Sequence, residues 1–188
     1  MNTPAACVRI QFASDLHLEW LERRFPHFRG VEPTDADVLV LAGDVASGSR
    51  ALELFADWPC PVVYVPGNHE FYGASVPALL AEFARSAAAF PNVTVLAPGV
   101  CELAGVRFIG CTLWTDYAVF GEATRAAAMY ACGEFITDHT AIKAEGDIPF
   151  TPGTARTLHL AQRQWLESQL AERFAGKTVV VTHHAPHP

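Results

Sequence analysis

The chain has 188 residues, of which 51% are hydrophobic and 18% charged, a balance that excludes an intrinsically disordered protein and favours one compact domain over residues 1–188. Thirteen Lys and Arg against twenty Asp and Glu give a formal net charge of −7, which argues against binding nucleic acid through a basic surface. The cysteines are scattered without a Cys-x-x-Cys pair, and no apolar run reaches the roughly 18 residues of a membrane span, so we expect a cytoplasmic protein outside the membrane.

Short apolar runs alternate along the chain with longer segments of helical periodicity. In the first half of the chain the patterns predict a strand at 8–12, a strand at 38–42 buried on both faces, a helix around 52–58, a strand at 62–65 and a helix around 76–83. A hairpin of 100–102 with 106–111 follows. The chain then forms a helix that begins after Pro152-Gly153 and stops at Gly176, and a last strand at 178–181. Strands that alternate with helices predict an α/β sandwich around a mixed sheet.

The segment 115–153 is less regular than the rest of the chain. It mixes glycines with aromatic residues and contains one expected helix near 122–131. One interpretation makes it a surface excursion. The other makes it an insert that acts as a lid over a site, because long loops in compact domains are often functional.

Polar side chains directly follow four of the expected strands. These residues are Asp15, His17, Asp44, Asn68, His69 and His183. Loops at the carboxyl ends of strands in an open α/β sheet gather in one crevice, where ligands bind. We therefore expect the six side chains to converge, although they span most of the sequence.

The residue types suit a divalent metal centre. Carboxylates, an amide oxygen and imidazoles are ligands of Mn²⁺, Zn²⁺ or Fe²⁺. Asp15 and His17 are two residues apart, so on an extended segment both side chains project to the same side and can chelate one ion. Asp44 has two carboxylate oxygens and can bridge two ions. Each motif alone has a structural explanation as a turn or a helix cap, whereas the combination favours a metal site.

With these motifs the sequence resembles the calcineurin-like metallophosphoesterases. The matching segments are Asp15-Leu16-His17, Gly43-Asp44, Gly67-Asn68-His69-Glu70 and Val181-Thr182-His183-His184-Ala185-Pro186. The resemblance implies a four-layer α/β/β/α sandwich with two metal ions at the strand ends. By motif position, Asp15 and His17 bind the first metal, Asp44 bridges, and Asn68 and His183 bind the second.

The resemblance also implies a reaction, the hydrolysis of a phosphoester by a water held between the two metals. It makes His69 the catalytic residue that meets the leaving group or a phosphoryl oxygen, with a brace of the metal-binding loop as the alternative. Trp114 and Asp116, just past the expected hairpin, are candidates for lining the substrate pocket. The alternatives for these two are a core residue and a turn residue.

The sequence departs from the family pattern in two places, one that concerns the metal ligands and one that concerns the substrate. A Gly-His-x-His motif normally follows His183, but this chain ends five residues later at Pro188. We therefore expect a C-terminally incomplete domain in which each metal lacks one protein ligand. The second departure is Ser47, which stands where protein phosphatases of the family carry an aspartate, and their phosphate-binding arginines are also absent. A small phosphodiester or nucleotide-like substrate therefore fits better than a phosphoprotein.

Two other functions remain open from the sequence. The first is a weakly active or inactive scaffold of the same fold that binds a protein partner. The missing histidines favour this function, and the six retained residues oppose it. A metal-dependent nuclease is made less attractive by the acidic charge.

Overall fold

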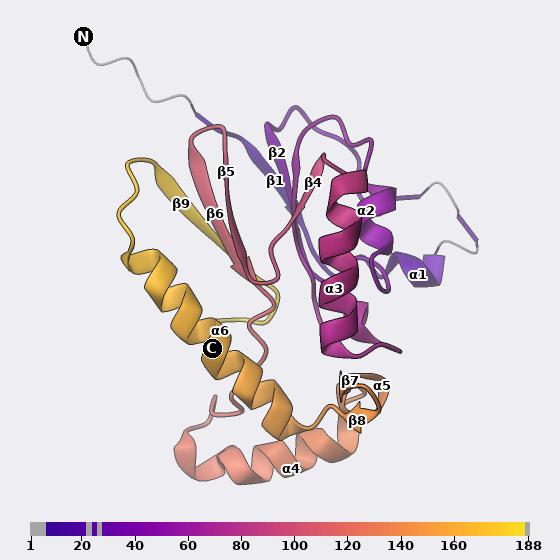
Figure 1. Cartoon of the computed structure of the whole chain (residues 1–188), viewed down its shortest axis with the longest axis vertical. Helices are drawn as coiled ribbons and strands as arrows, with labels where there is room; N and C mark the ends of the chain where they lie inside the picture. The colour runs from indigo at the N-terminus through magenta and orange to yellow at the C-terminus, as the bar shows by residue number, and fades with distance from the viewer. Residues whose placement is uncertain (1–6, 22–23, 26–27, 187–188) are drawn as a thin grey trace.

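The computed structural model describes residues 7–21, 24–25 and 28–186. Two β-sheets lie face to face between helices (Figure 1). The first sheet is parallel, in the order β1 (Ile10–Ala13), β2 (Val38–Ala42), β3 (Val62–Val65) and β4 (Val93–Val95). The second contains β5 (Gly99–Leu103), β6 (Val106–Cys111) and β9 (Lys177–Thr182), with β6 antiparallel to β5 and parallel to β9. A small ribbon pairs β7 (Lys143–Glu145) with β8 (Ile148–Pro149).

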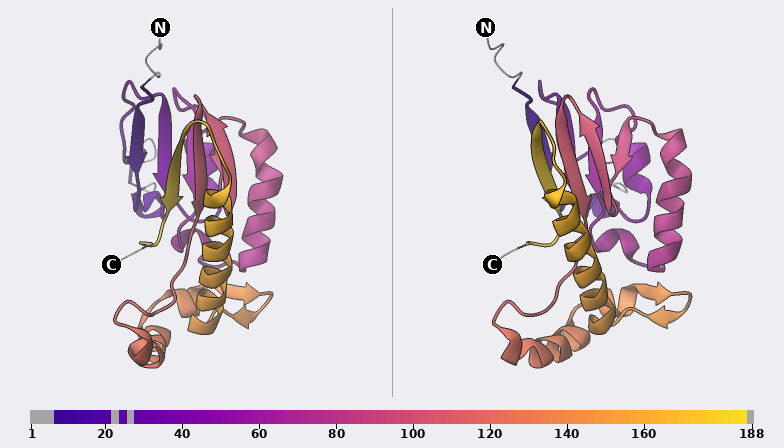
Figure 2. Two further views of the ribbon diagram at one scale, coloured as in Figure 1. Left: turned by 90° about the vertical axis from the view of Figure 1, so that its left-hand side faces the viewer. Right: turned by 60° about the vertical axis from the view of Figure 1, so that its left-hand side comes forward.

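Helices flank the pair of sheets, as the two views in Figure 2 show. The helices are α1 (Leu18–Leu21), α2 (Arg50–Leu54), α3 (Val76–Ser86), α4 (Arg125–Phe135), α5 (Asp138–Ala141) and α6 (Pro152–Ala171), with short 3₁₀ turns η1 (His69–Phe71), η2 (Ala87–Ala89) and η3 (Glu122–Thr124). In Figure 1, α2 and α3 lie against the first sheet and α6 lies beside the second. The layers are thus helix, sheet, sheet and helix, and the α/β class expected from the sequence is confirmed.

The alternation of side chains in β2 divides the core into two parts. Val38 and Val40 pack between the sheets against residues such as Phe108 of β6. Leu39 and Leu41 face the opposite way and join the cluster that contains the helices α2 and α3. These four side chains are buried, which confirms the expectation of a strand covered on both faces.

The predicted hairpin is confirmed, and its turn explains the register. Leu103 of β5 pairs with Val106 of β6, so only Ala104 and Gly105 connect the strands. Both residues have positive φ, 51° and 75°. This conformation matches the twist of two-residue hairpins and positions the rest of β6 for pairing with β9.

The long C-terminal helix ends earlier than its sequence pattern predicts, at Ala171 instead of near Gly176. Arg107 of β6 is buried beneath this end and donates to the carbonyl oxygens of Gln169 and Glu172 at 3.3 and 3.1 Å. These bonds satisfy carbonyl groups that a helix leaves without partners at its last turn. The chain then extends past Phe174, over whose ring the Arg107 guanidinium lies, into β9.

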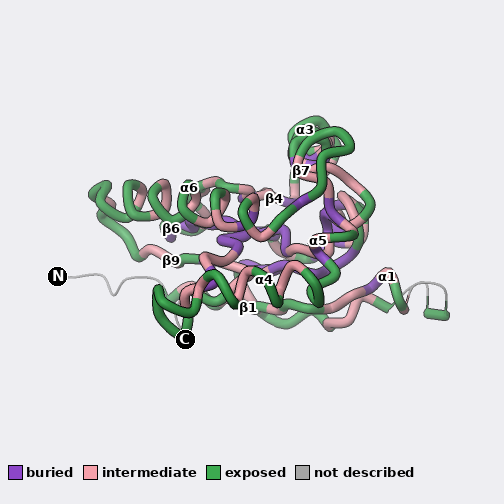
Figure 3. Tube along the Cα trace, turned by 90° about the horizontal axis from the view of Figure 1, so that it is seen from below, coloured by how far each residue is buried: buried purple, intermediate pink, exposed green. Residues whose placement is uncertain are grey.

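The segment 115–153 forms a separate layer beneath the strand ends (Figure 1). It contains η3, α4, α5 and the β7–β8 ribbon. Seen from below in Figure 3, α4 and α6 are largely exposed, whereas the buried positions gather in the strands behind them. All residues of α4 are among those that the structure describes, and none of them is buried. Of the helices in the described part of the chain, none combines the length and the apolarity needed to cross a membrane.

Candidate metal centre

The six polar residues expected to converge do lie together, at the carboxyl ends of strands from both sheets. Asp15 and His17 follow β1, Asp44 follows β2, Asn68 and His69 follow β3, and His183 follows β9. The parallel alignment of β1 with β2 and of β2 with β3 places the ends of these three strands side by side. The sandwich brings the end of β9 against them, which explains how a residue so distant in sequence completes the cluster.

Asp44 lies at the centre of this cluster and is only 5% exposed. Its Oδ1 is 3.4 Å from Nε2 of His183 and accepts a hydrogen bond of 2.9 Å from the backbone N–H of His69. Its Oδ2 is 3.9 Å from Nε2 of His17 and 3.8 Å from Nε2 of His69. Asp15, Asp44 and His183 each offer a ligand atom within 4.8 Å of the others. One carboxylate thus faces both halves of the cluster, as a bridging ligand must.

The backbone is strained at three of these residues. Asp15, His17 and Asp44 have φ values of 55°, 45° and 54°, a left-handed conformation that costs side-chain-bearing residues about 1–3 kcal/mol each. Two hydrogen bonds of 3.0 Å hold the strained loops to each other, from the N–H of Asp15 to the carbonyl of Gly43 and from the N–H of His17 to the carbonyl of Asp44. Such strain is typical of functional sites, where side chains must be aimed at a common point.

The hydrogen bonds of His183 and Asn68 leave lone pairs facing each other. Nδ1 of His183 lies 2.9 Å from the carbonyl oxygen of Ala42, which can only accept, so Nδ1 carries the proton. The amide nitrogen of Asn68 donates to Asp138 at 2.8 Å, so its Oδ1 faces Nε2 of His183 at 3.0 Å. Oδ1 of Asp44 approaches the same nitrogen. Three hydrogen-bond acceptors can lie this close together only around a proton or a cation. These oxygen and nitrogen ligand atoms therefore fit a divalent metal ion.

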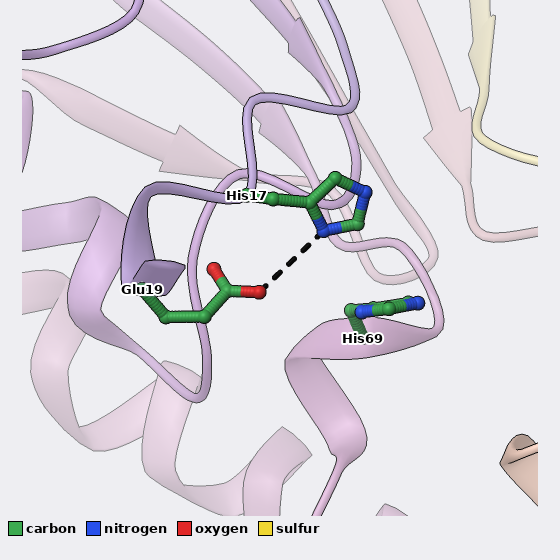
Figure 4. Close-up of side chains that lie close together, drawn as sticks. All are labelled: His17, Glu19 and His69. Carbon is green, nitrogen blue, oxygen red and sulfur yellow. Dashed lines mark ion pairs between the residues drawn. The ribbon is translucent and has the colours of Figure 1, made fainter. Parts of the chain in front are cut away.

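A second group of possible ligands lies on the other side of Asp44 and contains a residue that the sequence analysis missed. Figure 4 shows the carboxylate of Glu19 and the rings of His17 and His69 turned toward one another. Nδ1 of His17 is 3.5 Å from Oε1 of Glu19, and ligand atoms of the three residues lie within 4.8 Å of one another. Within the described part of the chain, Nδ1 of His17 and Oε2 of Glu19 are buried without a hydrogen-bond partner. Glu19 follows His17 by two residues, the same spacing that drew attention to Asp15.

Glu70 holds the metal-facing loops together from beneath. Its carboxylate is fully buried and accepts hydrogen bonds from the N–H groups of Asp44 and Gly67 on one oxygen, at 3.0 and 2.8 Å. The other oxygen accepts from the N–H of Val45 and the hydroxyl of Tyr64, both at 2.8 Å. Burial raises the pKa of Glu70 to about 7, against the lowering effect of the Val45 bond. The sequence analysis included Glu70 in a motif without giving it this role.

The close approach of Gly67 to Asp44 leads to a test. A Cβ atom on Gly67 would lie 2.1 Å from Oδ1 of Asp44. We expect Gly67→Ala to lower the free energy of unfolding by about 2 kcal/mol, because the loop must move away from the carboxylate. Urea denaturation measures this. Gly153→Ala is the control, since its Cβ would meet Thr151 only at an ordinary 3.5 Å. Equal stability of Gly67→Ala and the parent chain would contradict the prediction.

The two candidate substrate residues, Trp114 and Asp116, follow the end of β6, and the ring of Trp114 stacks on that of His184 at 5.7 Å between centroids. Trp114 is 3% exposed and packs in the core, with ring centroids 5.6 Å from Phe71 and 4.7 Å from Phe150. Asp116 accepts a hydrogen bond of 2.9 Å from the N–H of Ala118. These are the environments of a core residue and a turn residue, and the substrate-lining role of both stays a prediction.

Comparisons with known proteins agree with this geometry. The family model for calcineurin-like phosphoesterases matches residues 8–188. Among solved structures, the phosphopantetheinyl hydrolase PptH from Mycobacterium tuberculosis has the same fold, with a TM-score of 0.69 and 22% sequence identity over 96% of this chain and 70% of that chain. An uncharacterized protein of Acanthamoeba polyphaga mimivirus is 28% identical over 125 residues, or 57% of this chain. The match spans 44% of that relative, less than half its length.

Proposed function

This chain belongs to the calcineurin-like phosphoesterase family, and from that premise we propose that it hydrolyses a small phosphoester with two divalent metal ions. By motif position Asp15, His17 and Asp44 would hold the first ion, whereas in the structure Asp15 groups with Asp44 and His183. Asp44, Asn68 and His183 would hold the second. The observation that carries the proposal is the convergence of three acceptors on one point, from Asp44, Asn68 and His183. The mixed oxygen and nitrogen ligands suit Mn²⁺, Zn²⁺ or Fe²⁺.

Bound divalent ions would supply charge stabilisation for the phosphoryl group and lower the pKa of an attacking water. The role we propose for His69 is proton transfer to the leaving oxygen. Its ring stacks on Tyr72 at 4.2 Å between centroids and meets the ring of His17 edge-on at 4.5 Å, so its orientation is restricted. General acid catalysis of this kind contributes roughly 10²–10⁴-fold to turnover. The alternative role of His69, a brace of the metal-binding loop, needs only its backbone N–H, which donates a hydrogen bond to Asp44. The imidazole ring therefore stays available for proton transfer.

We propose a small phosphodiester or nucleotide-like phosphate as the substrate. Ser47 replaces the aspartate of the protein phosphatases, and their phosphate-binding arginines are absent from the matching motifs. The net charge of −7 opposes the electrostatic attraction on which nucleic-acid binding depends. A nuclease is therefore the weaker candidate.

An assay of the metal-free chain tests the proposal. Protein stripped with a chelator should not hydrolyse bis(p-nitrophenyl) phosphate, and addition of Mn²⁺, Zn²⁺ or Fe²⁺ should restore turnover of this diester. Hydrolysis of single-stranded DNA faster than of the small diester would support a nuclease instead. Binding of two metal equivalents without hydrolysis of any phosphoester would support the scaffold alternative and contradict an enzyme.

A further inference from the structure

A carboxylate from the segment beneath the strand ends reaches the metal centre. Asp138 begins α5 and is 8% exposed. Two backbone hydrogen bonds attach α5 and the following strand to the loop after η1, from Gly73 N–H to the carbonyl of Ala141 at 2.8 Å and from Lys143 N–H to the carbonyl of Ala74 at 2.9 Å. The position of Asp138 relative to the loop after β3 is therefore set by the backbone.

One oxygen of Asp138 accepts two hydrogen bonds. Oδ1 accepts from the amide nitrogen of Asn68 and from the hydroxyl of Tyr72, both at 2.8 Å. Burial and, second, the bond to Asp138 raise the pKa of Tyr72 well above its usual range, so its hydroxyl stays protonated and remains a donor. Asp138 is thus an acceptor served by two neutral donors.

These bonds decide which way the Asn68 amide faces. An ionised carboxylate only accepts, so the NH₂ group of Asn68 must point to Asp138 and the amide oxygen must point to His183. In the reversed orientation the NH₂ group would donate to the bare Nε2 of His183 and occupy the place of a cation. The reversed amide would also set its oxygen against the carboxylate of Asp138. Asp138 therefore excludes the orientation in which the NH₂ group of Asn68 takes the place of a cation beside His183.

We propose that Asp138 is a positioning residue that holds Asn68 in the metal-accepting orientation and so links the placement of α5 to occupancy of the second metal position. This inference rests on the two-ion centre of the proposed function. Groups that orient a metal ligand commonly change metal affinity by about 10- to 100-fold when they are removed. Because linkage is reciprocal, an ion bound at Asn68 must also stabilise the bound position of α5.

Titration of the chelator-treated full chain with Mn²⁺ by calorimetry provides the test. We expect Asp138→Leu to weaken the second Mn²⁺ by about 10- to 100-fold and to leave the first unchanged. Asp138→Asn should give a smaller loss, because its amide can present either an acceptor or a donor to Asn68. Asp147→Asn is the control: it removes an exposed carboxylate in the turn between β7 and β8 and should leave both Mn²⁺ constants as in the parent chain.

Hydrogen exchange gives a readout independent of turnover. Mn²⁺ should slow amide exchange in α5 of the parent chain and should not do so in Asp138→Leu. An unchanged second constant in Asp138→Leu overturns the inference, and if that variant does not fold, an unchanged constant in Asp138→Asn does so. A parent chain that takes up no second ion overturns the two-ion centre and this inference together. Loss of hydrolysis with both constants intact would count only against the proposed activity.

Discussion

Replacing Asp44 by Asn is expected to reduce metal-dependent turnover by about 10²–10³-fold, the scale seen when a group that stabilises developing charge is removed. Oδ1 of Asp44 accepts the backbone N–H of His69, so the oxygen of an Asn side chain would stay at that position. The NH₂ group would then replace Oδ2, which faces His17 and His69. The loop keeps its hydrogen bond, but the charge between the two ion positions is lost.

The same variant separates a catalytic effect from loss of the fold. Asp44→Asn should unfold in urea within about 1 kcal/mol of the parent chain, because the hydrogen bond from the N–H of His69 survives. Its kcat/KM for a chromogenic diester is the quantity to compare. Asp147→Asn, in the exposed turn between β7 and β8, is the matched control and should retain full turnover. Turnover by Asp44→Asn near that of the parent chain would exclude the bridging role.

The second large effect concerns stability and is expected for Glu70→Gln. All four partners of Glu70 are donors, so the NH₂ group of a Gln must face at least one N–H or hydroxyl donor instead of accepting from it. Charge-assisted hydrogen bonds contribute about 1.5–3 kcal/mol each, and a buried N–H left unpaired costs a similar amount. We expect the free energy of unfolding to fall by about 3 kcal/mol. Urea denaturation followed by circular dichroism measures it.

A conservative exposed substitution provides the comparison. Glu134 lies on α4 and is exposed, so Glu134→Gln should change the unfolding free energy by no more than about 0.5 kcal/mol. If Glu70→Gln behaved like this control, Glu70 would not hold the loops of Asp44 and Gly67 together. The stability loss should appear in the metal-free chain as well, because the hydrogen bonds of Glu70 do not involve an ion.

The part of the centre built from strand ends was predictable, because local order determines it. Buried parallel strands have recognisable apolar runs, and the residue that follows each run must lie at the same edge as its neighbours. Asp44 and His183 could therefore be placed in one cluster without a structure. Tertiary contacts determine the remainder. Asp138 meets Asn68 from 70 positions away, through a segment with no regular pattern. The end of α6 depends on Arg107, which belongs to a strand of the second sheet.

The absence of buried residues in α4, which the structure describes in full, has a consequence for protein engineering. Exposed helix positions away from caps and ion pairs usually tolerate replacement with changes of about 0.5 kcal/mol or less. The loops around Asp44 and Gly67 have no such freedom, since even a single added methyl group collides there. A library of variants at the exposed positions of α4 should therefore lose few members to misfolding, whereas Ala128, Met129 and Cys132 pack against the core and are best left unchanged.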